Sequence, residues 1–251
     1  MKKIIKIILG ANLISLPTLF KSKISDVMDS CSDAFTIVHM TDTKALATIP
    51  IVTMKDLLGG IEPEIKLSYT PPKNGRLPID QLIVLLALLV KNNPKKIIEI
   101  GTYFGHTTLA MSENSTAAIH TVDLPEDFLD TDDKEEIPKD DFHLISGRIT
   151  GKEFRGKNKN ITQHFGDTAA FNFAKIFDAD FIFIDGSHTY EYVKNDTEKC
   201  MSVTRKATFL WHDCDFGHPG IVRYLSELRA TGLDVKRIAD TPLGYLDYTK
   251  N

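Results

Sequence analysis

From residue 96 onward, short runs of consecutive apolar residues alternate with longer segments of helical periodicity. The runs lack the polar alternation of a half-exposed strand, as expected of strands buried on both faces. The predicted strands are Lys96–Ile100, Ala118–Asp123, Ile161–Phe165, Asp180–Asp185 and Thr208–His212. The predicted helices lie near Gly105–Glu113, Thr168–Phe177, Thr189–Val203 and Gly220–Ala230. This order predicts an α/β fold, with a parallel sheet covered by helices on both faces.

The two ends of this region depart from the alternation. Leu233–Ile238 and Gly244–Tyr248 follow one another with no helix between them, which predicts a closing hairpin and an antiparallel strand. Before the first strand, Pro78–Val90 is a predicted helix, since proline is tolerated in a first helical turn. We therefore place a catalytic domain at residues 76–251 and an N-terminal extension, partly helical and acting as a docking arm or lid, at residues 1–75.

The first twenty residues resemble a signal peptide only superficially. Three lysines precede an apolar stretch, but polar residues and Pro17 interrupt it, and no cleavage pattern follows. The stretch is also too short and too polar to span a bilayer. We expect a cytoplasmic protein with no integral membrane span, beginning with a docking helix or a poorly ordered arm. Cys31, Cys200 and Cys214 form no paired framework, which fits a reducing compartment.

Charge is balanced along most of the chain. The formal net charge is -4, so the net charge of the chain does not attract nucleic acid or an anionic membrane. One long connection is biased, because Glu126–Asp141 is rich in acids and Arg148–Lys159 is rich in bases. It is either a solvent-exposed loop whose acidic and basic halves partly neutralise each other, or a lid that selects the substrate.

The first predicted strand leads into a helix through Glu99-Ile-Gly-Thr-Tyr-Phe-Gly105. In an open α/β sheet, ligands bind beyond the carboxyl ends of the strands, where the strand order reverses. Gly101 and Gly105 permit a tight turn and close approach of a ligand. A nicotinamide dinucleotide favours a third, intermediate glycine beside its pyrophosphate, whereas Thr102, Tyr103 and Phe104 fill this interval. A dinucleotide is therefore disfavoured.

S-adenosylmethionine matches the polar groups around this loop. Glu99 can place its ammonium, directly or through the loop, and the helix start can accept its carboxylate. Asp123, at the end of the second strand, can accept both ribose hydroxyls. Asp167 and Thr168 follow the third strand, where the turn would reach the adenine edge. A turn with a helix N-cap explains these last two residues equally well.

Four segments in this order resemble class I S-adenosylmethionine-dependent methyltransferases, in particular the catechol O-methyltransferase-like group and related small-molecule and sugar O-methyltransferases. The segments are Ile98–Thr108, Thr121–Asp123, Phe181–Tyr190 and Leu210–Asp215. The resemblance implies a Rossmann-like doubly wound sheet of seven strands, mostly parallel with one antiparallel strand. It also implies cofactor contacts from Glu99, Gly101, Tyr103, Gly105, Thr107, Asp123 and Thr168.

Two acids end the fourth and fifth strands, and both should point into the same crevice. Asp185 and Asp213 would repel each other unless a cation lies between them, and a divalent ion would also lower the pKa of an acceptor hydroxyl. In the resembling metal-dependent enzymes the matching positions are metal ligands, and asparagine commonly follows the second. Cys214 stands there, so Asp215 is the candidate third ligand of Mg²⁺ or another divalent cation. Alternatively, Asp213 and Asp215 cap the following segment while Asp185 contacts the cofactor.

The candidate base is His188, three residues after Asp185, where the resembling enzymes place a catalytic lysine. Histidine suits proton transfer near neutral pH, with Asp185 as a catalytic partner. The alternative is that His188 starts the next helix and stays solvated. His212 precedes Asp213 in an extended segment, so we expect these two side chains to face different ways.

The leading hypothesis is a metal-assisted O-methyltransferase acting on a small hydroxylated acceptor, either a sugar or a natural product. One alternative is a metal-assisted hydroxylase or tailoring enzyme of the same fold. Another is a non-catalytic methyltransferase-like domain that binds partners through residues 1–75. The extended N-terminal arm is also compatible with a homodimer.

Overall fold

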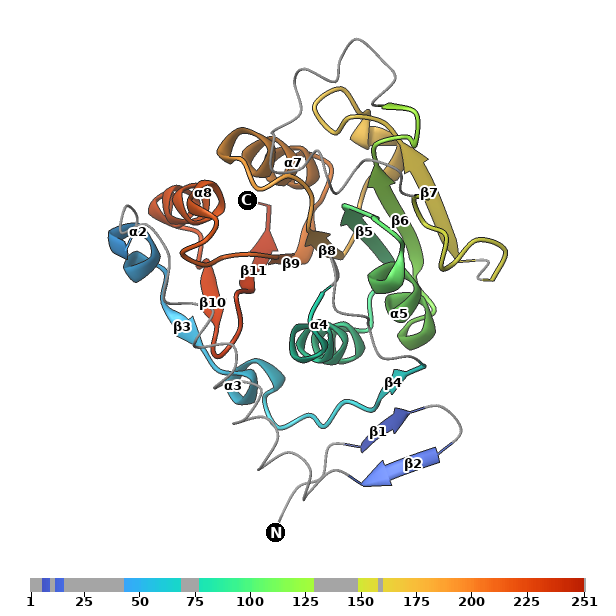
Figure 1. Cartoon of the computed structure of the whole chain (residues 1–251). Helices are drawn as coiled ribbons and strands as arrows, with labels where there is room; N and C mark the ends of the chain where they lie inside the picture. The colour runs from blue at the N-terminus through green and yellow to red at the C-terminus, as the bar shows by residue number, and fades with distance from the viewer. Residues whose placement is uncertain are drawn as a thin grey trace.

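An eight-stranded sheet forms the centre of the molecule (Figure 1). The computed structural model describes residues 6–9, 12–15, 43–68, 77–128, 149–157 and 160–250. The strand order is β3-β10-β11-β9-β8-β5-β6-β7. The bounds are β3 Ile51–Val52, β5 Lys96–Ile100, β6 Ala118–Asp123, β7 Ile161–Phe165, β8 Phe181–Ile184, β9 Lys206–Trp211, β10 Lys236–Ile238 and β11 Gly244–Thr249.

The topology confirms the doubly wound sheet. Strands β5 to β9 are parallel, and β11 lies antiparallel to both β9 and β10. The seven predicted strands are all present, but the prediction of seven was too low, because β3 adds an eighth beside β10. Strand β5 pairs with β6 on one side and β8 on the other, so strand order reverses there. The carboxyl ends of β5 and β8 therefore flank the expected ligand crevice.

Helices cover both faces of the sheet, as Figure 1 shows. Consecutive residues of the buried strands point to opposite faces, so Ile97 joins one core and Ile98 the other. One core packs α4 and α5 against the sheet, and the other packs α2, α7 and α8. The helix bounds are α2 Thr43–Thr48, α3 Met54–Leu58, α4 Ile79–Asn92, α5 His106–Asn114, α7 Tyr190–Ser202 and α8 Pro219–Ala230.

The helix predicted at Thr168–Phe177 is wrong over most of its length. Only a single 3-10 segment, η4 (Phe173–Ile176), forms there. Two short polar side chains bind nearby backbone instead: Asp167 accepts from the N–H of Ala169, and Asn172 accepts from the N–H of Ala174. Such local hydrogen bonds favour turns over a continuous helix.

Only β3 of the described strands in the N-terminal extension belongs to the central sheet. Strands β1 (Lys6–Leu9), β2 (Asn12–Ser15) and β4 (Ile65–Leu67) form a separate three-stranded sheet. The docking helix expected in the first twenty residues is thus wrong for the described parts of that segment, which pair as a β-hairpin. Most of the remaining N-terminal segment and of the charged connection lies outside the described residues. No helix in the described part of the chain is long and apolar enough to cross a membrane.

Candidate active site

Two glycines in the loop after β5 lie so close to neighbouring atoms that no side chain fits at either position. Gly101 has φ 92°, and a Cβ there would lie 1.9 Å from the carbonyl oxygen of Asp185. A Cβ on Gly105 would lie 2.5 Å from the ring of Phe154. The loop from β5 is therefore pressed against the residue that ends β8, which places the predicted cofactor loop beside the predicted catalytic acid.

The segment 149–157 closes over this loop from outside. The N–H of Gly151 donates to the carbonyl oxygen of Tyr103 at 2.8 Å, and the N–H of Glu153 donates to that of Phe104 at 3.0 Å. Phe154 is 6% exposed and packs over Gly105. This role could not be predicted from the sequence, because nothing in the aromatic residue or its charged neighbours indicates a contact with the loop. Farther along the connection, Arg155 pairs with Glu126, joining its basic and acidic halves.

Glu99 lies beneath the loop and is completely buried. Thr108 donates a hydrogen bond to its Oε2, while Oε1 has no hydrogen-bond partner among the described residues. Burial raises the pKa of Glu99 to about 8, although the hydrogen bonds from neighbouring threonines oppose the rise. This position supports an effect on the cofactor through the loop rather than through direct contact.

Asp123 holds the loop from the neighbouring strand. Its Oδ2 accepts from the N–H groups of Thr102 and Tyr103 at 3.0 and 2.7 Å, and its Oδ1 accepts from Leu124. The predicted ribose acceptor is thus also the residue that fixes the loop backbone. Tyr103 adopts φ 49°, a left-handed conformation that this contact helps to maintain.

The remaining predicted cofactor residues lie on adjacent loops and helix starts. Thr107 is in the first turn of α5 and is half-buried. Thr168 is buried, and its carbonyl oxygen accepts from Lys199 at 2.9 Å. Asp167 accepts from the hydroxyl of Tyr192 at 3.2 Å. These contacts fix the turn after β7.

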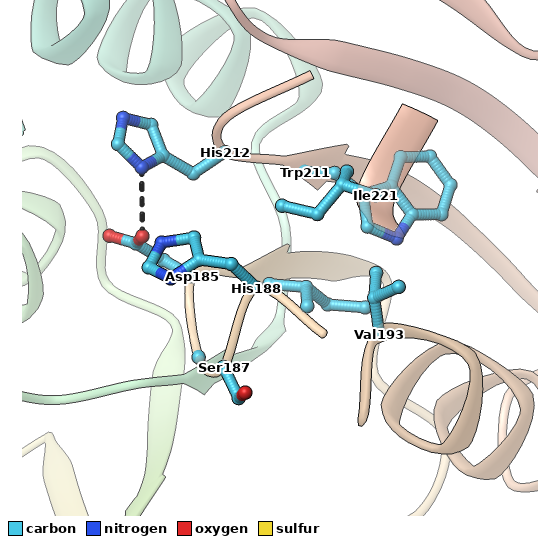
Figure 2. A pocket seen from close by; sticks show the side chains of 9 residues that line it. Asp185, Ser187, His188, Val193, Trp211, His212 and Ile221 are labelled. Atoms are coloured by element: carbon cyan, nitrogen blue, oxygen red, sulfur yellow. Dashed lines mark ion pairs between the residues drawn. The ribbon is translucent and has the colours of Figure 1, made fainter. Parts of the chain in front are cut away.

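The two strand-end acids meet around an imidazole. His212 Nδ1 lies 2.9 Å from Asp185 Oδ1 and 2.9 Å from Asp213 Oδ2. Figure 2 shows the His212 ring directed at Asp185 across the pocket. The expectation that His212 and Asp213 face different ways is wrong. Side chains alternate only while the backbone stays extended, and Asp213 leaves β9 with φ 55°, which turns its carboxylate back toward His212.

His188 joins the cluster from the loop between β8 and α7. Its Nε2 lies 2.9 Å from Asp213 Oδ2. Thr189, not His188, caps the helix, because its hydroxyl accepts from the N–H of Tyr192. Burial alone would raise the pKa of Asp213, but the imidazoles of His188 and His212 hold it well below its usual range.

The structure does not bring Asp215 together with the other two predicted metal ligands. Asp215 Oδ1 accepts from the N–H of Gly217 at 2.8 Å and lies 2.9 Å from His218 Nδ1, so it caps its own loop. Cys214 is 1% exposed, and burial raises the pKa of its thiol to about 12. Two residue sets in the described part of the chain place three potential metal-ligand atoms close together: Asp185, His212 and Asp213, and His188, Asp213 and His218.

Residues 98–214 match a family model described as a methyltransferase domain. This stretch spans the loop after β5, Asp123, Asp185, His188 and Asp213. The matched stretch and the sheet topology are those of a methyltransferase domain with the class I fold. No curated protein matches it.

Solved methyltransferases share the fold at low sequence identity. PaMTH1 of Podospora anserina, solved bound to SAH, is 14% identical, with 97% of this chain and 100% of that chain covered and a TM-score of 0.52. The O-methyltransferase TomG of Streptomyces achromogenes, solved with SAM, is 13% identical, with 90% and 96% covered and a TM-score of 0.50. The O-methyltransferase NovP is 14% identical, with 69% and 81% covered and a TM-score of 0.54.

Proposed function

We propose that this methyltransferase transfers the methyl group of S-adenosylmethionine to a hydroxyl oxygen of a small molecule. The observation that carries the proposal is the pairing of His188 with Asp213 beside Asp185, beyond the carboxyl ends of β8 and β9. The Gly101 loop touches Asp185 directly, so a cofactor on that loop would present its methyl group near this cluster.

The cofactor is assigned to the loop and its two neighbouring strand ends. The helix start at Gly105 to Thr107 would receive the carboxylate, and Asp123 would accept the ribose hydroxyls. Asp167 and Thr168 would border the adenine. Gly101 and Tyr103 shape the loop surface, with Glu99 supporting it from below.

His188 would accept the proton of the acceptor hydroxyl. With Nε2–H donated to Asp213, the neutral imidazole carries its lone pair on Nδ1, where it can act as a base. The acceptor oxygen forms a bond to the methyl carbon as the carbon–sulfur bond breaks, leaving S-adenosylhomocysteine. The proton passes to His188, so the charges balance. Holding the hydroxyl in line with the methyl group supplies much of the rate.

A divalent cation fits part of the predicted site. His212 Nδ1 is buried without a hydrogen-bond partner in the described structure, and two carboxylates converge on it. Asp185 and Asp213 would hold the ion, whereas the geometry does not favour Asp215 as a ligand. When bound, the ion would lower the pKa of the acceptor hydroxyl.

The solved relatives support oxygen as the methyl acceptor. TomG is described as an O-methyltransferase involved in tomaymycin synthesis, and NovP as an O-methyltransferase. We propose an acceptor of that general kind, a hydroxylated natural product or sugar, in the cytoplasm, where the buried free thiols Cys200 and Cys214 would remain reduced. Residues 1–75 would serve as a docking arm or lid, and a homodimer is compatible with that role.

Calorimetry with S-adenosylmethionine and S-adenosylhomocysteine tests the cofactor assignment, followed by a methyl-transfer screen of hydroxylated acceptors. We expect the His188→Asn variant to keep cofactor affinity and to lose about 10²- to 10⁴-fold in kcat. His120→Asn is the matched control, because His120 pairs with His164 on β7, away from the acid pair. A His188→Asn variant as active as His120→Asn would refute the assignment of the base.

A further inference from the structure

His212 forms two distinct contacts, one through each ring nitrogen. Its Nε2 lies 2.7 Å from Oε1 of Gln81, a nearly buried residue of α4. Because an amide oxygen only accepts, Nε2 must carry the hydrogen. The neutral ring therefore has its lone pair on Nδ1, which faces carboxylate oxygens of Asp185 and Asp213 at 2.9 Å.

A cation among these three atoms, either a proton on Nδ1 or a metal ion, relieves the repulsion between the two carboxylates. The three atoms lie close enough together to hold one ion, and Nδ1 makes no hydrogen bond of good geometry to either carboxylate. An outer hydrogen bond that fixes the tautomer and orientation of a histidine is characteristic of metal-ligating imidazoles. Gln81 supplies such a bond from a rigid helix.

We propose that His212 is a nitrogen ligand in a site completed by Asp185 and Asp213, and that the site selects a first-row transition-metal ion over Mg²⁺. Imidazole suits ions such as Mn²⁺, Co²⁺ and Zn²⁺, whereas Mg²⁺ takes oxygen ligands almost exclusively. The inference rests on the proposed function, since it specifies the ion of the same active site. Gln81 is a positioning residue, because it acts through His212.

The neighbouring set of His188, Asp213 and His218 is the weaker candidate. His218 Nδ1 is 2.9 Å from Asp215, and the His188 and His218 rings pack with centroids 4.7 Å apart. His188 is also placed to serve the acceptor. Substituting His188 and substituting His212 should therefore have different effects on ion binding.

Ion binding is measured directly, on full-length protein stripped with a chelator and saturated with S-adenosylhomocysteine. Co²⁺ is followed by its visible absorption, and Mn²⁺ and Mg²⁺ by calorimetry. We expect one equivalent of Co²⁺ or Mn²⁺ to bind at least about tenfold more tightly than Mg²⁺. No saturable binding of Co²⁺ or Mn²⁺, or equal affinity for Mn²⁺ and Mg²⁺, would overturn the inference. In the first case His212 would hold the acids as an imidazolium.

Two variants identify the ligand. His212→Asp exchanges nitrogen for oxygen, so the preference should shift toward Mg²⁺, and an unchanged ratio of affinities contradicts the proposal. Gln81→Leu should weaken Co²⁺ binding by about 10- to 100-fold while cofactor affinity is retained. His188→Asn removes a hydrogen bond to the ligating carboxylate of Asp213, so it should weaken Co²⁺ binding by no more than about 10- to 100-fold, whereas the control His120→Asn should leave it unchanged. Loss of Co²⁺ in His188→Asn with retention in His212→Asp would assign the other set.

The readouts separate this inference from the proposed function. Cofactor binding is measured without an added ion, and acceptor methylation is not needed for the metal titrations. A protein that binds S-adenosylmethionine and methylates an acceptor but binds no transition metal would refute only the metal assignment. A protein that binds Co²⁺ through His212 but transfers no methyl group would refute only the O-methyltransferase assignment. If His212→Asp does not fold, the Gln81→Leu measurement still decides the role of His212.

Discussion

Replacing Gly101 with alanine should damage both the stability of the fold and the cofactor site. The new Cβ would lie 1.9 Å from the carbonyl oxygen and 2.6 Å from the carbonyl carbon of Asp185. Both are backbone atoms, so no side-chain rotation relieves the clash. The ends of β5 and β8 must separate, which threatens the 2.8 Å hydrogen bond from the N–H of Asp185 to Ile100.

The magnitude has three parts. A left-handed alanine costs about 1–2 kcal/mol, the overpacking about 1–3 kcal/mol, and the weakened hydrogen bond about 1 kcal/mol. The sum is about 3–6 kcal/mol, which corresponds to a fall in Tm of roughly 6–24 °C for a chain of this size. Gly232→Ala is the matched control, because Gly232 has φ 99° and no atom within 4 Å of the added Cβ. That control should cost only about 1–2 kcal/mol.

Trp211 provides the assay, because it is the single tryptophan and is completely buried. Its fluorescence during urea unfolding compares the two alanine variants with the parent, and calorimetry measures their affinity for S-adenosylhomocysteine. We expect Gly101→Ala to lose at least about tenfold in affinity, since the loop and Asp185 both move. Equal stability and equal affinity in Gly101→Ala and Gly232→Ala would show that the contact between β5 and β8 does not shape the site.

Two further predictions concern carboxylates, the buried Glu99 and the half-buried Asp180. The pKa of Glu99 is raised from 4.5 to about 8, so the unfolded chain releases this proton first as pH rises, and the stability of the parent falls across that interval. Glu99→Gln removes this decline, so its free energy of unfolding in urea should exceed that of the parent by a margin that grows with pH, toward roughly 3–5 kcal/mol above pH 8. Parallel pH profiles of the two proteins would contradict the assignment. Asp180 accepts hydrogen bonds from the N–H groups of Lys95 and Lys96 at 2.9–3.0 Å. Asp180→Ala should therefore lower the free energy of unfolding by about 2 kcal/mol and the Tm by roughly 4–8 °C. An unchanged Tm would show that water replaces these hydrogen bonds at no cost.

The sheet could be predicted because its central strands are buried on both faces. β5, β6 and β7 have the predicted bounds. An apolar run determines the bounds of β5, whereas β6 and β7 contain polar residues, and β7 is a half-exposed strand at the edge of the sheet. β3 has two residues and carries no such pattern, so it was missed. Its pairing depends on β10, which lies at the other end of the chain.

Only the part of the candidate site that lies at strand ends could be predicted from the sequence. Asp185 and Asp213 converge because parallel strands present their carboxyl ends at one edge. The direction of His212 depended instead on the left-handed turn at Asp213, which no hydrophobic pattern reveals. Gln81 was missed for a different reason: its contact joins α4 to the end of β9, far apart in sequence.

The pairing of β3 with β10 also affects the order of folding during synthesis. Residues 51 and 52 are synthesised long before β10 and β11, so β3 has no neighbour and β9 keeps an open edge until both of those strands have been made. An exposed sheet edge pairs readily with another chain. Chains truncated near residue 230 should therefore aggregate, and the soluble fraction should recover when the truncation point is moved beyond β11.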